Sequence, residues 1–277
     1  MKTEQTDDTE GRRGRHVYAS VQSTLPVQMD LGDRARAKSN YKNAKTIPFN
    51  GLLTNRLLTG LPGEDFAQLL LHLEPVSLLA GQDLYEFGAD EVDFIYFPET
   101  AVISHVYFLK DGSTTAAAII GKDGIVGLSA ILDAPRPSYW SQVTIGGTAV
   151  RVRPDIIKQE FSRGGAMQRL VLRYLSRRLA QLSQKAVCNG RHKLEERFCT
   201  WLLMIQDRVS DDNVPLTHEE MAQHLGARRA GITGACNVLR DSGIITYHRG
   251  LLCIVDRASL ERTACECYRD LKEFQVD

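Results

Sequence analysis

The sequence predicts an α+β protein built from three successive parts, and three patterns within its 277 residues lead to this fold class. Residues 76–153 hold short β-rich runs separated by turn signals, a pattern typical of an all-β sandwich or barrel. A long helix with a leucine seam follows them. Residues 216–245 then read as two short amphipathic helices hinged on Gly226, and a predicted β-hairpin comes directly after.

The composition allows two folded domains and excludes several classes of protein. The chain is 43% hydrophobic and 25% charged, and its formal net charge of zero argues against a wholly basic nucleic-acid coat while leaving room for local basic stripes. No apolar run approaches the roughly 20 residues that span a bilayer, and the start lacks a signal-peptide pattern, so we expect a cytoplasmic protein. No order of nucleophile, histidine and acid, and no Gly-rich phosphate loop, indicates an enzyme.

The first 46 residues are polar and show no sustained hydrophobic period, which predicts a mostly disordered tail. We expect a sensor domain over residues 47–165, opening with two helices. The residues at helical spacing in the first are Leu52, Leu53, Leu57 and Leu58, and those in the second, after Pro62, are Phe66, Leu69, Leu70 and Leu73.

A single long helix is predicted over residues 166–190. Its apolar residues follow steps of 3, 4, 3 and 4, the two-per-heptad seam of a helix that pairs with another helix. The seam consists of Leu172, Leu175, Leu179, Leu182 and Ala186. The alternative is that this seam packs on the helix's own domain. Arginines occupy the remaining faces of the helix and leave only a narrow apolar stripe to bury, which favours a homodimer.

The last part, residues 191–277, contains the stretch that points to function. Thr217 and Glu220 form a capping box, so a helix is expected to start at about His218. Its inner face holds Met221, Ala222 and Leu225, and Gly226 permits a sharp turn. The inner face of the next helix is expected to hold Ile232, Ala235, Val238 and Leu239. The small Ala222, the glycine at 226 and the branched Ile232 stand at the spacing that a helix-turn-helix requires.

Two short β-runs, GIITYH and GLLCIVD, follow the second helix and meet at Arg249-Gly250. A hairpin directly behind such a helix is the pattern of a winged helix. The helix dipole disfavours the paired cations Arg228 and Arg229 at the start of the second helix. Bidentate binding of guanine or a phosphate clamp would explain their presence.

The candidate DNA contacts are Thr217, His218, Arg228, Arg229, Gly231 and Thr233. For each threonine, a purely local capping or packing role accounts for the sequence equally well.

These segments resemble the Crp/Fnr family of bacterial transcription regulators over about residues 50–275. The matching stretches are FIYFPETAVIS, the DGS turn before TTAAAIIGKDGIVG, the leucine-seamed helix, and LTHEEMAQHLGARRAGIT with its hairpin. The resemblance implies a cyclic-nucleotide-binding-like β-roll of jelly-roll type, a long dimerisation helix and a C-terminal winged helix-turn-helix. It further implies a homodimer that binds double-stranded DNA at a palindromic operator, with RNA polymerase as a further partner.

The departures from the family pattern bear on the effector. In members that bind cyclic AMP, a glutamate follows a glycine, and an Arg-Ser or Arg-Thr pair lies nearby. Here Gly127 is followed by Leu128, and Arg136-Pro137-Ser138 is a distorted pair. Without the glutamate, a ribose hydroxyl of the nucleotide would be buried without its partner, which costs about 1–3 kcal/mol of binding free energy. Cyclic AMP is therefore not expected as the effector. Gly127, Arg136 and Ser138 remain the candidate effector residues.

The cysteines are expected to be reduced and mostly buried, without a metal or cofactor. None precedes Cys188, so the N-terminal iron–sulfur cluster of the oxygen-sensing branch is absent. Cys265 and Cys267, if they lie on one helix, diverge by about 200° and cannot share an ion without unwinding. Cys236 would report oxidation only if it were exposed.

Two functions remain open from the sequence. The first is a sequence-specific transcription regulator whose β-roll responds to an unidentified signal. The other is a small-ligand-binding signalling module whose helical C-terminal region contacts proteins and has no affinity for duplex DNA.

Overall fold

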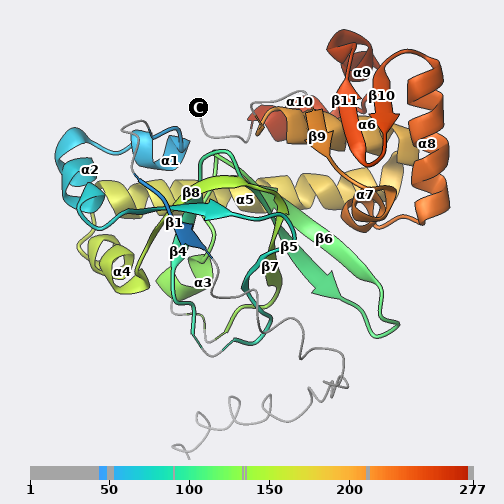
Figure 1. The fold of residues 1–277 in the computed structure, drawn as a ribbon. Coiled ribbons are helices and arrows are strands. Elements are labelled where there is room, and N and C mark those ends of the chain that lie inside the picture. The colour runs from blue at the N-terminus through green and yellow to red at the C-terminus, as the bar shows by residue number, and fades with distance from the viewer. Residues whose placement is uncertain are drawn as a thin grey trace, which may run out of the picture. The chain divides into compact units, whose positions relative to one another are not determined.

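The computed structural model describes residues 44–48, 53–89, 91–132, 134, 136–209 and 213–273 (Figure 1). Most of the predicted tail, and Leu52, therefore lie outside the described residues. The predicted tail boundary was too late, because Lys45 and Thr46 form strand β1 and pair with β2, with Lys45 opposite Ser77. Ordered structure thus begins before residue 47.

Two short helices precede the sheets, as predicted: α1 (Arg56–Thr59) and α2 (Gly63–Leu70). Asn55 caps α1, and its buried side-chain carbonyl accepts hydrogen bonds from two amides of that helix. The side-chain amide of Asn55 donates to the carbonyls of Pro98 and Gly124 at 2.9 and 3.0 Å. One side chain therefore satisfies the helix end and connects it to a strand end at Pro98 and to a turn at Gly124.

The predicted all-β region consists of two four-stranded antiparallel sheets with strand orders β1-β2-β8-β4 and β3-β7-β5-β6 (Figure 1). The strands are β2 (Glu74–Leu78), β3 (Asp83–Tyr85), β4 (Ile95–Pro98), β5 (Val102–Phe108), β6 (Thr114–Ile120), β7 (Trp140–Ile145) and β8 (Gly147–Val152). Val76 and Ala149 of one sheet and Ile103 and Val143 of the other share a buried core. Two short helices, α3 (Leu128–Ile131) and α4 (Pro154–Ser162), contact each other beside the sheets.

The long helix α5 (Ala166–Arg191) matches the predicted one within a residue. At its start it buries Met167, Val171 and Tyr174 in a core shared with α1, α2 and the first sheet. Four of the five predicted seam residues are exposed in the single chain, and Leu179 is 66% exposed. Leu175 differs, because it is half-buried and packs against the chain's own core.

The C-terminal region is built on α6 (Leu194–Gln206), whose residues 198–205 are all buried. The elements after it are β9 (Asn213–Pro215), α7 (His218–Leu225), α8 (Arg229–Asp241), β10 (Ile245–His248), β11 (Leu251–Ile254), α9 (Arg257–Thr263) and α10 (Cys267–Glu273). The antiparallel sheet β10-β11-β9 contains the predicted hairpin and one further strand. No helix of the described residues has the length and hydropathy needed to span a bilayer.

A buried ion pair joins the sheet region to the end of α6. The guanidinium of Arg208 donates to the carboxylate of Asp123 at 2.6 Å, and the two side chains are 2% and 9% exposed. Arg208 also donates to the carbonyl of Met204 at 2.8 Å. Two desolvated charges are tolerated at this position because each has its partner in place.

We predict that Asp123→Ala lowers the free energy of unfolding by about 3–5 kcal/mol, because it leaves the Arg208 guanidinium buried without a counter-charge. Urea unfolding followed by circular dichroism measures the change. The matched control is Glu160→Ala, which removes a more exposed ion pair to Arg163 and should change stability by about 1 kcal/mol or less. Equal effects of the two variants would contradict the interpretation.

Candidate nucleic-acid interface

The first helix of the predicted pair begins where the capping box places it. The amide of Glu220 donates to the Thr217 hydroxyl at 3.2 Å, and the Glu220 carboxylate accepts from the Thr217 amide at 2.7 Å. Both orphan donors of the helix start are thereby satisfied within four residues. The Thr217 hydroxyl also donates to the Glu220 carboxylate at 2.8 Å, so this side chain has a full local role.

The turn between the helices depends on Gly226, which ends α7 in the left-handed region at φ 58°. A residue with a β-carbon would be strained there. The guanidinium of Arg197 from α6 donates to the carbonyl of Leu225, an acceptor otherwise left free at the helix end. The sequence therefore encodes the turn locally, and the hydrogen bond from Arg197 of α6 stabilises it.

The inner face of α8 agrees with the prediction except at one position. Ile232, Ala235 and Leu239 are buried, but Val238 is 58% exposed, so its assignment to the inner face was wrong. Cys236 is buried in its place, because residues 232, 236 and 239 lie along one stripe of the helix. Burial raises the pKa of the Cys236 thiol to about 11, and the exposure required for its suggested oxidation is not met.

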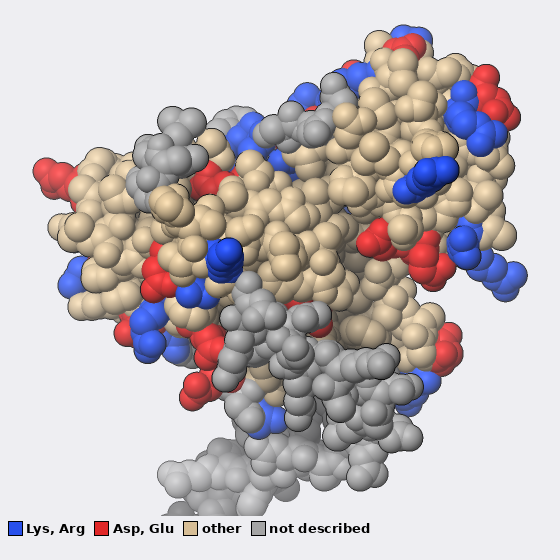
Figure 2. Space-filling view, viewed as in Figure 1, with Lys and Arg blue, Asp and Glu red and all other residues tan. Residues whose placement is uncertain are grey.

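Arg228 and Arg229 are exposed at the N-terminal end of α8, and Arg228 is its N-cap residue. Neither guanidinium has an ion-pair partner among the residues that the structure describes. In Figure 2, several Lys and Arg side chains lie along the edge where Figure 1 places α8, with acidic groups beside them. The paired cations that the sequence singled out therefore face outward at the start of the second helix.

The other predicted contacts in this region are engaged within the domain. The His218 ring stacks on Tyr247 of the hairpin at 4.5 Å between ring centroids, and its Nδ1 lies 3.0 Å from the Thr233 hydroxyl. The Thr233 hydroxyl also donates to the carbonyl of Arg229 at 3.0 Å. Burial, and then the nearby Arg229 charge, lower the pKa of His218. These two side chains join α7, α8 and the hairpin.

Gly231 faces α6, since a β-carbon there would lie 2.9 Å from a methyl group of Leu194. Two exposed residues of the same surface were not singled out from the sequence. Asn237 lies on the solvent side of α8, and Arg249 occupies the hairpin turn with the unusual φ of 50°. The helical period marks Asn237 as outward-facing, and the Arg-Gly turn marks the hairpin tip.

The candidate effector residues are not grouped in one cavity. Arg136 lines an open depression of about 460 Å³ together with Arg153 and Lys158, whereas Gly127 and Ser138 do not line it. Gly127 is buried and caps α3. Leu128, which stands where the family's cyclic-AMP-binding members carry glutamate, packs against the apolar core.

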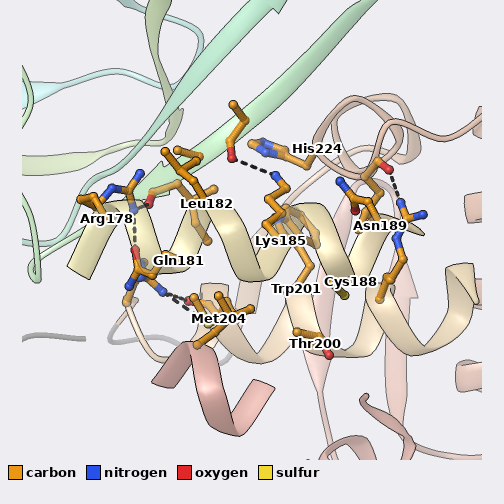
Figure 3. A pocket seen from close by; sticks show the side chains of 17 residues that line it. Arg178, Gln181, Leu182, Lys185, Cys188, Asn189, Thr200, Trp201, Met204 and His224 are labelled. Atoms are coloured by element: carbon orange, nitrogen blue, oxygen red, sulfur yellow. Dashed lines mark hydrogen bonds between the residues drawn. The ribbon is translucent and has the colours of Figure 1, made fainter. Parts of the chain in front are cut away.

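A smaller cavity of about 80 Å³ lies where α5 and β6 meet α6 and α7 (Figure 3). Its labelled side chains come mainly from α5 and α6, and the Lys185 ammonium donates to the carbonyls of Ala116 and Ala117 at 2.7 and 3.1 Å. Burial, followed by repulsion from Arg178 and Arg197, lowers the pKa of Lys185 to about 8. His224 of α7 lines the same cavity and stacks on Trp201.

The cysteines near the C-terminus are arranged differently from the expectation. α10 begins at Cys267, and Cys265 lies in the connection that follows α9. The premise that both thiols stand on one helix and diverge was therefore wrong. Cys265 and Cys267 lie together beside Cys188 and His192 at the end of α5.

Comparison with known proteins decides the family of the C-terminal region. Residues 196–263 match the sequence model of the Crp-like helix-turn-helix domain. The protein carries a Crp-like helix-turn-helix domain. A search of curated protein sequences gives no match.

The chain also shares its fold with several solved structures. FixK2 from Bradyrhizobium japonicum superposes with a TM-score of 0.60 at 16% identity, covering 70% of this chain and 98% of that one. A CRP-family transcriptional regulator from Thermus thermophilus gives 0.56 at 21% identity, covering 68% and 95%. A CRP/FNR-family transcriptional regulator from the same organism gives 0.56 at 17% identity, covering 69% and 98%.

The predicted resemblance to Crp/Fnr regulators is confirmed by the domain match and by the shared fold. The α+β architecture, with a sheet domain, a long helix and a terminal helix-turn-helix, is confirmed with it.

His224 should make stability depend on pH. Burial, and then the Lys185 charge, lower the pKa of His224 in the folded protein to about 3. An unfolded histidine titrates near 6.5, so the unfolded chain binds more protons below that pH and stability falls as the pH falls. We expect His224 to contribute a loss of about 2 kcal/mol between pH 7 and pH 5.

Urea unfolding at both pH values, with the wild type and His224→Phe, measures this contribution. The variant should lose that part of the pH dependence, whereas His72→Phe at an exposed position should keep it. His105, which is also buried with a lowered pKa, is present in both variants and cancels from the comparison. An unchanged slope in His224→Phe would contradict the assignment.

Proposed function

We propose that the protein is a homodimeric, sequence-specific DNA-binding transcription regulator of Crp/Fnr type. Its sensor domain covers residues 44–165, its dimerisation helix residues 166–190 and its DNA-binding domain residues 191–277. The observation that carries the proposal is the pair Arg228-Arg229 at the N-terminal end of α8 of a Crp-like helix-turn-helix domain, exposed and without an acidic partner among the described residues. In this motif, the N-terminal residues of the second helix meet base edges in the major groove.

Each exposed polar group of the surface has a role suited to its chemistry. Arg228 and Arg229 would bind guanine O6 and N7 bidentately or clamp phosphates. Asn237 has the amide that pairs with adenine, and the hairpin places Arg249 at its tip for a phosphate. Ala230 and Gly234 present no side chain that reaches a base, so the operator should differ from those of regulators with longer residues there. Thr217, His218, Gly231 and Thr233 would act by fixing the position of α8.

Dimerisation would place two such helices in successive major grooves, roughly 34 Å apart, on a palindromic operator. The exposed apolar residues of α5 support this arrangement, because apolar side chains at heptad spacing bury best against a second helix. A signal in the sensor domain would act by changing this helix pairing and therefore the spacing of the two α8 helices. RNA polymerase remains the expected further partner of the DNA-bound dimer.

Cyclic AMP is not the proposed effector. Leu128 supplies no carboxylate for a ribose hydroxyl, and it is packed in the apolar core. Arg136 stays the one candidate effector residue in an open depression, with Arg153 and Lys158 as further cationic groups.

The double variant Arg228→Ala, Arg229→Ala should lose sequence-specific DNA binding. Selection from a random duplex pool by the wild type at about 0.15 M salt should yield a palindromic motif, and fluorescence anisotropy on that duplex then compares the variants. Each lost bidentate contact removes about 1–3 kcal/mol, so affinity should fall by about tenfold or more. The matched control, Lys45→Ala, Arg163→Ala, removes the same charge from exposed positions of the sensor domain that do not line the Arg136 depression, and it should change affinity little.

Equal losses in both double variants would indicate a general charge effect and contradict the assigned role of α8. If the wild type enriches no DNA sequence, either with or without small-molecule extracts, the result would favour the alternative of a signalling module that contacts proteins.

The seam on α5 generates a separate prediction. Leu172→Gln, Leu179→Gln should convert a dimer into a monomer, measured by analytical ultracentrifugation, because both side chains are more than half exposed in the single chain. Leu175 is a poorer target, since it also packs in the chain's own core. The control Leu71→Gln, Leu79→Gln changes two exposed leucines away from α5 and should leave the dimer intact. A dimeric seam variant would exclude this interface.

A further inference from the structure

Four side chains of types that can bind a metal come from separate parts of the chain and converge at the C-terminal end of α5. The ligand atoms of Cys188, His192, Cys265 and Cys267 all lie within 4.8 Å of one another. Cys188 and His192 are one helical turn apart, so they project from the same side of the end of α5. Cys265 lies in the connection before α10, and Cys267 is the first residue of that helix.

Two of the distances between these ligand atoms match those expected around one tetrahedral ion, and all four atoms lie within 4.8 Å of one another. With Zn–S bonds near 2.3 Å and Zn–N bonds near 2.05 Å, tetrahedral geometry places two sulfur ligands about 3.8 Å apart and a sulfur and a nitrogen about 3.6 Å apart. The Cys188 and Cys265 sulfurs are 3.6 Å apart, and the Cys267 sulfur is 3.5 Å from His192 Nδ1. Small adjustments of side-chain torsions would therefore complete the coordination sphere. An iron–sulfur cluster, whose sulfur ligands stand on different iron atoms, would require wider spacing.

Neighbouring side chains make hydrogen bonds to three of these four residues, in orientations that would hold them ready to bind a metal. His192 Nε2 lies 3.2 Å from the Glu266 carboxylate, which would hold the proton on Nε2 and leave Nδ1 free to bind a metal. Gln184 donates to the Cys267 sulfur at 3.2 Å, and the Thr200 hydroxyl lies 3.0 Å from the Cys265 sulfur. Hydrogen bonds of this kind stabilise thiolates, the form of cysteine that binds metal.

Burial indicates a closed site. Cys188, Cys265 and Cys267 are 5%, 6% and 1% exposed, and the His192 side chain is 17% exposed. Four protein ligands leave no open position for water or substrate, which distinguishes a structural zinc site from a catalytic one. Three thiolates and an imidazole are a soft ligand set that suits Zn²⁺ and disfavours Mg²⁺ or Ca²⁺.

We propose that Cys188, His192, Cys265 and Cys267 bind one structural Zn²⁺ ion that fastens α10 to the end of α5. The ion would cross-link the dimerisation helix and the last helix of the DNA-binding domain. Since metal binding by such a site adds to the folding free energy, this connection would resist unfolding more strongly with zinc than without it. The proposal does not depend on DNA binding, and its test reads metal content.

The first experiment measures metal in the full-length protein, purified under reducing conditions from cells grown with added zinc. Inductively coupled plasma mass spectrometry should find one zinc per chain. Replacement by Co²⁺ should give the thiolate-to-cobalt charge-transfer band and the intense visible bands of a tetrahedral site. Cys265→Ser, Cys267→Ser should reduce zinc to background, whereas Cys253→Ser, at a cysteine outside the cluster, should retain it.

A second pair of variants tests the positioning role of Glu266 without removing a ligand. Glu266 is mainly exposed, so Glu266→Ala should fold normally. Chelator competition should show zinc affinity about tenfold lower in this variant. Glu273→Ala, at an exposed acid of α10 outside the cluster, should leave the affinity unchanged.

Wild-type protein without zinc and without a cobalt thiolate band would overturn the proposal. So would a Cys188–Cys265 disulfide in protein kept under reducing conditions, found by mass spectrometry. If the double cysteine variant does not fold, the cobalt spectrum of the wild type and the Glu266→Ala affinity still decide the question.

Discussion

The structure depends on one constraint: the 26 residues of α5 pack against the sensor domain, pack against the C-terminal domain and carry the proposed contact with a second copy of the chain. Its first turns bury Met167, Val171 and Tyr174 against the sensor domain, and its last turns reach the C-terminal domain through Cys188. The remaining face of α5 carries leucines that are exposed to solvent in the single chain. Because apolar surface of this kind is unfavourable in water, the same helix that joins the two domains also supplies the proposed contact with a second copy.

Polar groups removed from water hold the C-terminal domain against the sheets. The pair Arg208–Asp123, the Lys185 ammonium on β6 carbonyls and the neutral His224 ring all lie along this contact. The charged groups are tolerated only while their partners stay in place, since an unpaired buried charge is strongly unfavourable, whereas His224 avoids this cost by staying neutral. The contact between the domains is therefore specific in geometry, and a shift of α5 would disturb several of these partners together.

The proposed DNA-binding surface departs from a local rule of helix termini. A helix N-terminus favours negative charge, yet α8 begins with two exposed arginines that pair with no acid in the described chain. Around them, the Thr217 capping box, the Gly226 turn and the stacked His218 fix the helix position. In the proposed function these two arginines are the groups that bind DNA, and the surrounding residues would supply the rigidity that precise contact requires.

The sequence by itself determined the features set by nearby residues: the start of α7 at its capping box, the turn at Gly226, the hairpin at Arg249-Gly250, and the length of α5. These follow from hydrogen bonds and periods that span a few residues. Only the tertiary structure decided that Val238 is exposed, that Gly231 packs on Leu194, and that Leu175 belongs to the chain's own core. It alone brought Cys188 and His192 beside Cys265 and Cys267, because residues more than 70 positions apart meet through packing that no local period encodes.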